Sequence, residues 1–395
     1  MYSIERTVLP NGLTVMTSTV PTTTATVSLT FPVGSAADGE KSGIAHFLEH
    51  TLVHPKSLMA VYVRGAECDF STDQVSTQYV LHGNAKDVKE LIRALAEAVF
   101  AKKLNRRLVE TERGAILNEI AQVKNEDAVT SWIKRTLYPD AMEIHAPICG
   151  TVASVNSILY DDLVEFRERW YSSHGALLVV VGSIEHKQVV RWALNAPFPR
   201  LDQPSRTWRG VRYSPTQTRA TYKEAVSNSI SAYFQIPSVD ELTVHADVAC
   251  AILTAYPFGL MPKCLRFIDG KLYTASYELG GSTWSDVYID LDVTPRGARF
   301  AEKRLKECLS KLITCKYDPA IFDACKARLV RSGVAIRELN DPIVCADWIA
   351  NEWLGGGDEP NDLLDIYASI TQEEVTAFAE QYLHPDAYSL LHFKR

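Results

Sequence analysis

The sequence predicts an α+β protein in which one α/β unit is repeated along the chain. The length of 395 residues, with 46% hydrophobic residues, is enough to bury two cores. Segments with strand-like and helix-like patterns return in the same order in both halves. A stretch rich in proline, arginine and serine separates the halves and is typical of a linker. We therefore expect one domain at residues 1–194, a linker at 195–215 and a second domain at 216–395.

In the first half, alternating apolar residues predict strands, and apolar residues three and four apart predict helices. An alternating segment from Thr7 to Thr17 turns at Asn11-Gly12, and a second strand is expected from Thr24 to Val33. The next elements are a strand, three helices and an apolar strand, expected at Val75–Leu81, Ala85–Lys102, Leu108–Asn125, Tyr160–Tyr171 and Ala176–Val181.

The second half repeats this order. A strand is expected at Ser229–Gln235, and a helix is expected to begin near Ala246. Two strands are then expected at Leu272–Leu279 and Asp286–Val293, followed by two helices at Ala298–Thr314 and Pro319–Leu339. The clearest internal match pairs Ser157–Leu163 with Ser369–Val375 and continues into an apolar strand at the end of each half. Such a match in fixed order indicates a duplicated domain.

Two histidines and a glutamate lie close together in His46-Phe47-Leu48-Glu49-His50, on a predicted helix. Positions three and four apart share a helix face, so His46 and His50 can bind one metal ion, with Glu49 beside a water on it. H-x-x-E-H is the inverted zincin signature, and imidazole ligands favour zinc over magnesium or calcium. The alternative is a helix with two exposed or core histidines. The second half has no such motif, so we expect Zn²⁺ in the first domain alone.

A catalytic zinc needs a third protein ligand and an open position. Glu112, Glu119 and Glu126 recur every seven residues and share one stripe of a predicted helix. A solvated acidic face is the alternative explanation of this stripe. Further candidates without a helical partner are His54, His82, His145 and His174.

H-F-L-E-H followed by E-R-x-x-I-L-x-E-I resembles the pitrilysin family of inverted zinc metallopeptidases. The chain is most similar to the half-length, processing peptidase-like members, and the resemblance extends from Leu9-Pro10-Asn11-Gly12-Leu13 to the final strand. It implies two homologous domains, each a mostly antiparallel sheet covered by helices. It also implies zinc bound by His46, His50 and Glu119.

The resemblance implies further roles. Glu49 is the expected catalytic base, and Glu112 is expected to support activity without binding the metal, whereas Glu126 has no family role. In the second half, Leu265-Arg266 and Tyr273 resemble an L-R…Y element whose arginine and tyrosine hold the substrate. Tyr273 and Arg266 are therefore expected to stabilise the oxyanion or to anchor the peptide backbone.

The chain departs from the family pattern in the edge strand that pairs with substrate, where Asp69-Phe70-Ser71 replaces Asn-Ala before a threonine or serine. We expect these residues to bind substrate, Phe70 to narrow the cleft, and Asp69 to favour a positively charged or hydroxyl-bearing group. The segment 53–63 is shorter than usual, and the glycine-rich turn before the L-R helix is reduced to 258–262. No departure removes a zinc ligand or the base.

These residues predict a zinc metalloendopeptidase that cleaves peptides or leader segments bound as an added β-strand in a closed chamber. One alternative is a subunit of a heterodimeric processing peptidase for a ribosomally made natural-product precursor. Another is a non-catalytic scaffold subunit, which the intact H-x-x-E-H makes less favourable, and a third is a metal-binding protein without activity. The expected assembly is a homodimer, or a heterodimer with a homologous chain.

Composition excludes other classes. The net charge of -7 without a basic run argues against nucleic acid, and no apolar stretch is long enough to span a bilayer. The N-terminal residues resemble neither a secretory signal nor a transit peptide, so a cytoplasmic location is expected. The eight cysteines contain no C-x-x-C pair and are expected to be reduced, acting as small hydrophobic residues.

Overall fold

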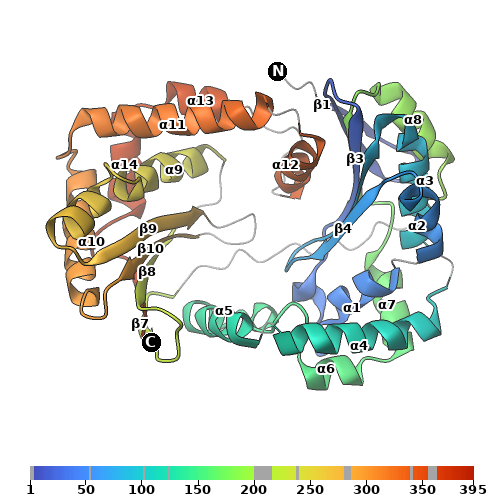
Figure 1. The fold of residues 1–395 in the computed structure, drawn as a ribbon, viewed down its shortest axis with the longest axis horizontal. Helices are drawn as coiled ribbons and strands as arrows, with labels where there is room; N and C mark the ends of the chain where they lie inside the picture. The colour runs from blue at the N-terminus through green and yellow to red at the C-terminus, as the bar shows by residue number, and fades with distance from the viewer. Residues whose placement is uncertain are drawn as a thin grey trace. The chain divides into compact units, whose positions relative to one another are not determined.

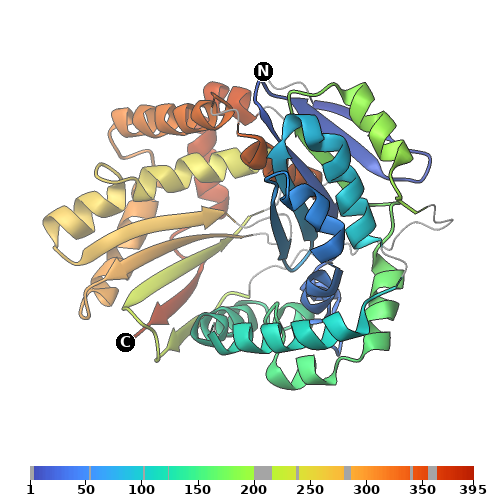
Figure 2. The same ribbon diagram turned by 45° about the vertical axis from the view of Figure 1, so that its right-hand side comes forward.

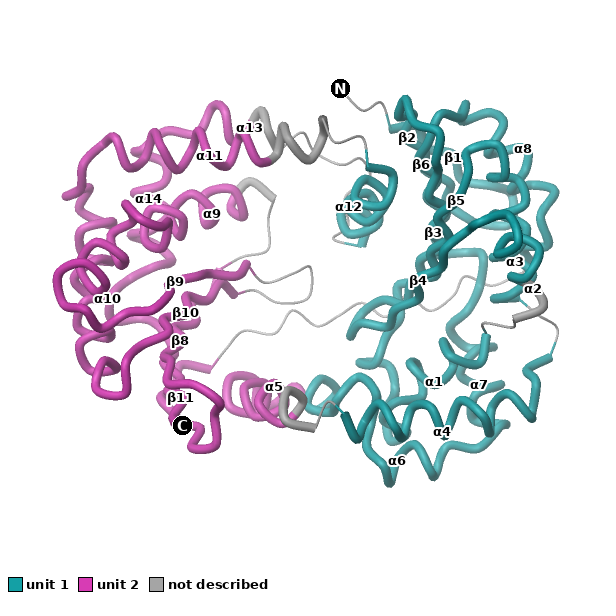
Figure 3. Tube along the Cα trace, in the orientation of Figure 1, with its two compact units in different colours: residues 1–127, 142–210, 336–360 teal, residues 128–141, 211–335, 361–395 magenta. Residues whose placement is uncertain are grey.

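The computed structural model of the chain describes residues 4–52, 55–100, 103–122, 124–199, 216–236, 240–279, 286–338, 341–354 and 363–395. Contacts divide the chain into two compact units, coloured separately in Figure 3. Unit 1 comprises residues 1–127, 142–210 and 336–360, and unit 2 comprises residues 128–141, 211–335 and 361–395. Each unit therefore includes one segment from the other half of the sequence.

The expected linker at 195–215 lies largely outside the described residues. The boundaries at 194 and 216 consequently remain a prediction.

Unit 1 is built on a six-stranded sheet with the order β1-β2-β6-β3-β5-β4. Neighbouring strands are antiparallel except β2 and β6, which are parallel. Strand β4 forms one edge of this sheet and β1 the other. The strands are β1 (Ile4–Val8), β2 (Thr14–Thr19), β3 (Thr24–Phe31), β4 (Glu67–Thr72), β5 (Thr77–Asn84) and β6 (Leu177–Gly182).

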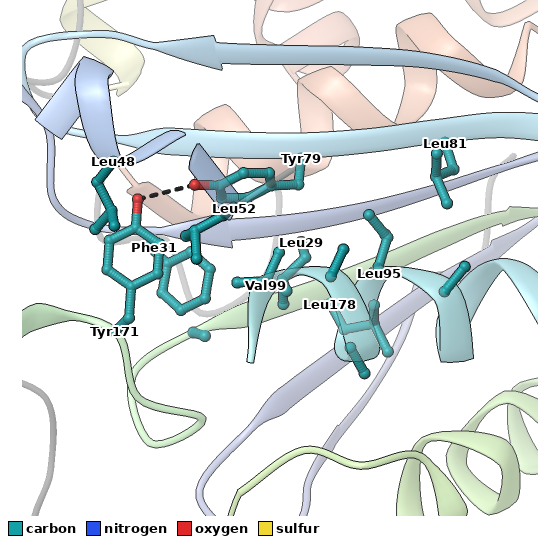
Figure 4. Close-up of a cluster of buried hydrophobic side chains, with 14 of the residues drawn as sticks. Leu29, Phe31, Leu48, Leu52, Tyr79, Leu81, Leu95, Val99, Tyr171 and Leu178 are labelled. Carbon is teal, nitrogen blue, oxygen red and sulfur yellow. Dashed lines mark hydrogen bonds between the residues drawn. The ribbon is translucent and has the colours of Figure 1, made fainter. Parts of the chain in front are cut away.

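One face of this sheet packs against helices to form the main core of unit 1. Figure 4 shows Leu29 and Phe31 from β3 beside Tyr79 from β5, with Leu48 of helix α1 near them. The hydroxyl groups of Tyr79 and Tyr171 are 3.1 Å apart, so these buried phenols satisfy each other. Helices α3 and α8 lie on the same side of the sheet (Figures 1 and 2). The helices around this core are α1 (Ile44–Leu52), α2 (Pro55–Tyr62), α3 (Val88–Val99), α7 (Tyr160–Trp170) and α8 (His186–Asn195).

The opposite face is covered by α12 (Pro342–Leu354), which comes from the second half of the sequence. Ile349 and Ala350 of this helix are buried with Met16 of β2 and Val179 of β6. Strand β6 is therefore buried on both faces, which explains its uninterrupted apolar sequence. Local sequence patterns did not predict α12. They also did not predict that this segment of the second half would pack in unit 1.

The expected helix at 108–125 is observed as α4 (Arg106–Gln122), and it is followed by α6 (Val152–Ser157) in the same unit. Between them, α5 (Lys124–Leu137) contributes residues 128–137 to unit 2. Trp132 of α5 packs against Tyr222 and Phe393, with ring centroids 5.3 and 5.8 Å apart. These aromatic contacts join this part of α5 to strands β7 and β11 of unit 2.

Unit 2 contains a five-stranded sheet with the order β7-β11-β8-β10-β9. Strands β7 and β11 are parallel, and the other neighbours are antiparallel. The order and directions match those of β2-β6-β3-β5-β4 in unit 1, which confirms the predicted duplication. The strands are β7 (Arg219–Tyr222), β8 (Ser229–Gln235), β9 (Leu272–Leu279), β10 (Asp286–Val293) and β11 (Ser389–Phe393).

The helices of unit 2 include the expected second-half helices and the internal match. Helix α7 and its counterpart α14 begin in the same way: the Leu159 amide donates to Asp162 and the Thr371 amide to Glu374, each at 2.7 Å. The helices are α9 (Asp240–Thr254), α10 (Ala298–Ile313), α11 (Pro319–Glu338), α13 (Leu363–Ser369) and α14 (Gln372–Tyr382), with a π-helical turn at Pro262–Ile268. No helix within the described part of the chain has the length and apolarity needed to cross a membrane.

Candidate metal centre

The start of helix α1 is fixed by Asp38 and Gly43. The Asp38 carboxylate accepts hydrogen bonds from the Gly43 amide at 2.6 Å and the Ala45 amide at 3.1 Å. Gly43 has a φ of 91°, and a Cβ there would lie 2.7 Å from the Cys149 carbonyl oxygen, so only glycine fits. These contacts satisfy amides of the first helical turn and set the direction in which the histidines project.

Helix α4 is attached to α1 and α6 by Arg113. Its guanidinium donates to the carbonyl groups of Val155 and Ile158, the latter at 2.9 Å. The same group lies over the Phe47 ring, 5.0 Å from its centroid. Arg113 thus fixes the position of α4, which carries Glu112 and Glu119, against the helix that carries the histidines.

His46, His50 and Glu119 converge on one point. Glu119 Oε2 lies 3.8 Å from His46 Nε2 and 3.9 Å from His50 Nε2. These separations exceed a hydrogen bond and are slightly wider than the roughly 3.3 Å between ligand atoms around a tetrahedral zinc ion. Two imidazoles and one carboxylate, with a fourth position open, form a donor set of the catalytic zinc type. Among the described residues, this is the one group that could hold a metal ion.

His46 is in the neutral state that a metal ligand requires. Burial, with the neighbouring His50 as the second cause, lowers the pKa of His46 to about 4. His50 Nδ1 lies 3.1 Å from Glu112 Oε2, so the ring donates there and its Nε2 remains available on the Glu119 side. Glu112 therefore orients a candidate ligand without joining the ligand group.

Glu49 has different surroundings from Glu119. Its side chain is buried and accepts a hydrogen bond from Thr72 Oγ1 at 3.0 Å. Burial raises the pKa of Glu49, although His50 and the Thr72 hydrogen bond act in the opposite direction. A carboxylate held in this way can accept a proton and release it again.

The predicted substrate residues lie on edge strand β4. Asp69 and Ser71 are exposed, whereas Phe70 is partly buried and packs against Tyr79, with ring centroids 5.6 Å apart. Phe70 shares its strand face with Thr72, the residue bonded to Glu49. The structure thus brings the end of β4 to the candidate base, and the roles of Asp69, Phe70 and Ser71 in binding remain a prediction.

Arg266 and Tyr273 come together within unit 2. The Arg266 guanidinium donates to the Tyr273 carbonyl oxygen and lies 5.1 Å from the centroid of the Tyr256 ring. Tyr273 is 60% exposed on β9, the edge strand that corresponds to β4. Phe267 is also exposed beside Tyr256, at a centroid distance of 6.0 Å. Tyr256 and Phe267 thus form an exposed aromatic surface beside the Arg266 guanidinium.

The spare histidines do not extend the metal group. His82 bonds to Thr26 at 3.0 Å, and His174 lies against Gly12 at the β1–β2 turn. His145, which is buried, is absent from the three-residue group as well. His54 and the side chain of Glu126 lie outside the described residues. Sequence reasoning did not identify the local cap formed by Asp38, or the contacts of Arg113 and Thr72, whose partners are distant in the chain.

Comparisons with known proteins agree with this architecture. The family profile "Insulinase (Peptidase family M16)" matches residues 13–147, and "Peptidase M16 inactive domain" matches residues 157–329. The mitochondrial-processing peptidase subunit beta of Saccharomyces cerevisiae is 26% identical over 97% of this chain and 89% of its own length. An uncharacterised zinc protease of Streptomyces coelicolor is 28% identical, but over only 48% of this chain and 43% of its own length.

Solved structures share the fold. A protease from Helicobacter pylori superposes with a TM-score of 0.84 at 17% identity, and the match covers 100% of both chains. This confirms the predicted two-domain architecture of sheets covered by helices. Since profiles for both halves of the family match in sequence order, the chain belongs to the insulinase family, peptidase family M16.

Proposed function

We propose that this chain is a zinc-dependent endopeptidase. The observation that carries the proposal is the convergence of His46, His50 and Glu119, with the buried Glu49 on the same helix but outside the ligand group. Zinc held by these three side chains would polarise the scissile carbonyl and lower the pKa of water. The similarity to proteins named as zinc proteases supports this choice of metal.

Glu49 is the proposed general base and acid. It takes a proton from the attacking water and delivers it to the leaving amine. Its burial favours the protonated form and the Thr72 hydrogen bond favours the ionised form, so both states are accessible. Glu112 keeps His50 oriented throughout, through the Nδ1 contact.

The proposed substrate is a peptide that pairs with β4 as an added strand. The outer edge of β4 has no neighbouring strand in the described sheet, and its Thr72 contacts the base. Main-chain hydrogen bonds along such an edge give affinity, and pockets for alternate side chains give selectivity. For Arg266 and Tyr273 we retain the roles that the resemblance implies: anchoring the peptide or stabilising the oxyanion.

A subunit role is the second candidate. A relative that matches nearly the whole chain is named as the beta subunit of a processing peptidase, which favours action together with a homologous chain. The intact metal group argues against a purely structural role. This second proposal includes a heterodimeric peptidase that removes the leader of a precursor peptide and in which this chain is one subunit.

Cleavage of a synthetic peptide library by the purified, zinc-loaded chain tests the proposal. We expect cleaved peptides with the wild-type protein and at least about 100-fold less cleavage with the Glu49→Gln variant at equal zinc content. If the chain is inert alone but cleaves when a homologous chain is added, the subunit proposal replaces self-sufficient activity. Equal product from the wild-type and Glu49→Gln proteins would refute the assigned mechanism.

A further inference from the structure

A pocket of about 500 Å³ lies within unit 1, between strands β4 and β5 and helix α12. Its β4 wall is formed by Glu67, Cys68, Asp69 and Ser71. Along the strand, the exposed side chains of Glu67, Asp69 and Ser71 alternate with those of Cys68 and Phe70. Cys68 and Phe70 pack against the core that contains α1. The pocket therefore lies on the α12 face of the sheet, away from the helix that carries the metal ligands.

Acidic groups predominate in the lining of the pocket. Glu67, Asp69 and Asp347 contribute carboxylates and His82 contributes an imidazole, and none of the described residues that line it is a lysine or arginine. Burial raises the pKa of Asp347, so a cation beside it would be favourable. Val80 and Val344 add apolar walls. A long side chain with a hydrocarbon stem and a positive end matches this lining.

A buried hydroxyl gives a second and independent indication of a ligand. Ser28 on β3 lines the pocket and is only 2% exposed. Its Oγ has no hydrogen-bond partner among the described residues. Buried hydroxyls are normally paired, so Ser28 offers an unused acceptor to a donor group that enters the pocket.

The position of the pocket along β4 relates it to the candidate base. Thr72 at the end of β4 contacts Glu49, and Asp69 precedes it by three residues, a distance of about 10 Å along a strand. A peptide paired with the free edge of β4 places the residue opposite Asp69 on the same face as Asp69. That residue projects toward the pocket, while the residue opposite Thr72 projects toward α1.

We propose that this pocket is a specificity subsite for a lysine or arginine side chain of the bound peptide, about three residues from the residue that pairs with Thr72. Helix α12 supplies one wall, so a segment from the second half of the sequence selects the substrate at the metal-binding unit. The inference deepens the proposed function and rests on it, since it assumes a peptide strand along β4.

Affinity selection tests the subsite without requiring cleavage. The full-length, zinc-loaded Glu49→Gln protein is incubated with a random synthetic peptide library, and retained peptides are sequenced. The same selection is run with Asp69→Asn and Asp347→Asn added together, and with Asp69→Asn added alone. Glu5→Gln is the matched control, because it removes one carboxylate from the exposed face of β1, at the opposite edge of the same sheet.

We expect lysine or arginine to be enriched at one position of the retained peptides. Replacing that arginine by neutral citrulline should weaken binding about tenfold, as measured by fluorescence anisotropy, because one charge-assisted contact is lost. The ratio of the dissociation constants of the citrulline and arginine peptides should approach one in the doubly substituted protein. It should remain unchanged in the Glu5→Gln control. Retention of peptides without basic enrichment, retention of none, or an unchanged ratio after both Asp substitutions would overturn the subsite.

Hydrolysis of the selected peptides by the protein with Glu49 intact separates the two proposals. Charge-dependent binding without hydrolysis would refute the peptidase and leave the subsite standing. Hydrolysis that does not distinguish arginine from citrulline would refute the subsite and leave the peptidase standing.

Discussion

At the scale of single residues, the surroundings of each carboxylate in the candidate metal centre predict a separate role for it. Glu119 Oε2 faces the Nε2 atoms of both histidines, whereas Glu49 is buried and bonded to Thr72. Glu112 contacts the opposite ring nitrogen of His50. Because the three contacts involve different atoms, their removal should affect different properties.

The first prediction separates the base from the ligand. Glu49→Gln should retain zinc and lose hydrolysis by a factor of about 10²–10⁴, because an amide cannot accept the proton. Glu119→Gln should weaken zinc binding itself, because an amide is a poorer ligand than a carboxylate. Elemental analysis and peptide cleavage measure the two effects. Identical zinc content and activity in the two variants would show that the roles are wrongly assigned.

The second prediction concerns the orientation of His50. Glu112→Ala should weaken zinc affinity about 10–100-fold, because Nδ1 of His50 loses the group that fixes its tautomer and ring angle. Glu112→Gln should have a smaller effect, since its amide oxygen can still accept the hydrogen bond. Competition with a chelator gives the affinities. Glu97→Gln on α3 is the matched control, and an equal loss there would argue against a specific role.

At the scale of elements, helix α1 depends on contacts that the linear pattern does not show. The Asp38 carboxylate is buried and bonded to two amides, and Arg113 joins α4 to α1 and α6. The motif His46–His50 could be predicted because helical spacing is local. Asp38 lies close to its partners in the chain, whereas Arg113 bonds to carbonyl groups 42 and 45 residues away, beyond the reach of a local pattern. The acidic stripe gave several candidate ligands, and the structure brings Glu119 to the imidazoles.

For the strands and helices, too, local patterns could be predicted and contacts between distant segments could not. Strands β8, β9 and β10 were predicted at their observed limits, because a short apolar run in β8 and alternating burial in β9 and β10 are local signals. Helices α5 and α12 were missed, since their partners lie in the other half of the sequence. The local pattern of apolar residues indicates that one face of a helix or strand is buried. It does not identify the surface against which that face packs.

The third prediction tests the cap of α1. Asp38→Ala should lower the free energy of unfolding by about 1–3 kcal/mol, because two amides lose their acceptor. Asp38→Asn should cost less at neutral pH, because it keeps one acceptor oxygen. Urea denaturation of both variants measures the difference. A fully stable Asp38→Ala protein would show that the cap contributes little.

The same residue gives a pH dependence. Burial raises the pKa of Asp38 from 3.8 to about 7, so the folded protein binds this proton more tightly than the unfolded chain. The stability from this group is therefore complete below pH 4 and is lost as the pH rises through about 7. Asp38→Asn should gain stability relative to the wild type between pH 5 and pH 8. A constant difference over this interval would contradict the shift.

At the scale of the whole molecule, one chain carries the H-x-x-E-H motif and the Arg266–Tyr273 pair. The metal group belongs to unit 1 and the pair to unit 2, and each unit repeats the same sheet order. The two copies of the duplicated unit therefore carry different groups of candidate functional side chains. From this combination we expect peptide cleavage without a second kind of subunit, most simply by a homodimer.

The fourth prediction concerns Tyr273. Tyr273→Phe should retain zinc and lower kcat by a factor equivalent to about 3 kcal/mol if its hydroxyl contacts the oxyanion. Steady-state kinetics, with the mass of the active species measured by light scattering, checks both the residue and the assembly. An unchanged kcat would remove Tyr273 from the mechanism, and activity restricted to a mixed complex would contradict the homodimer.

The metal content of the purified chain tests the central claim most directly. Elemental analysis should find about one zinc per chain in the wild type. It should find almost none in the His50→Ala protein, because a histidine and a carboxylate cannot hold the ion alone. Circular dichroism should show that the variant is folded. Full zinc occupancy in folded His50→Ala protein would contradict the assignment of the metal centre.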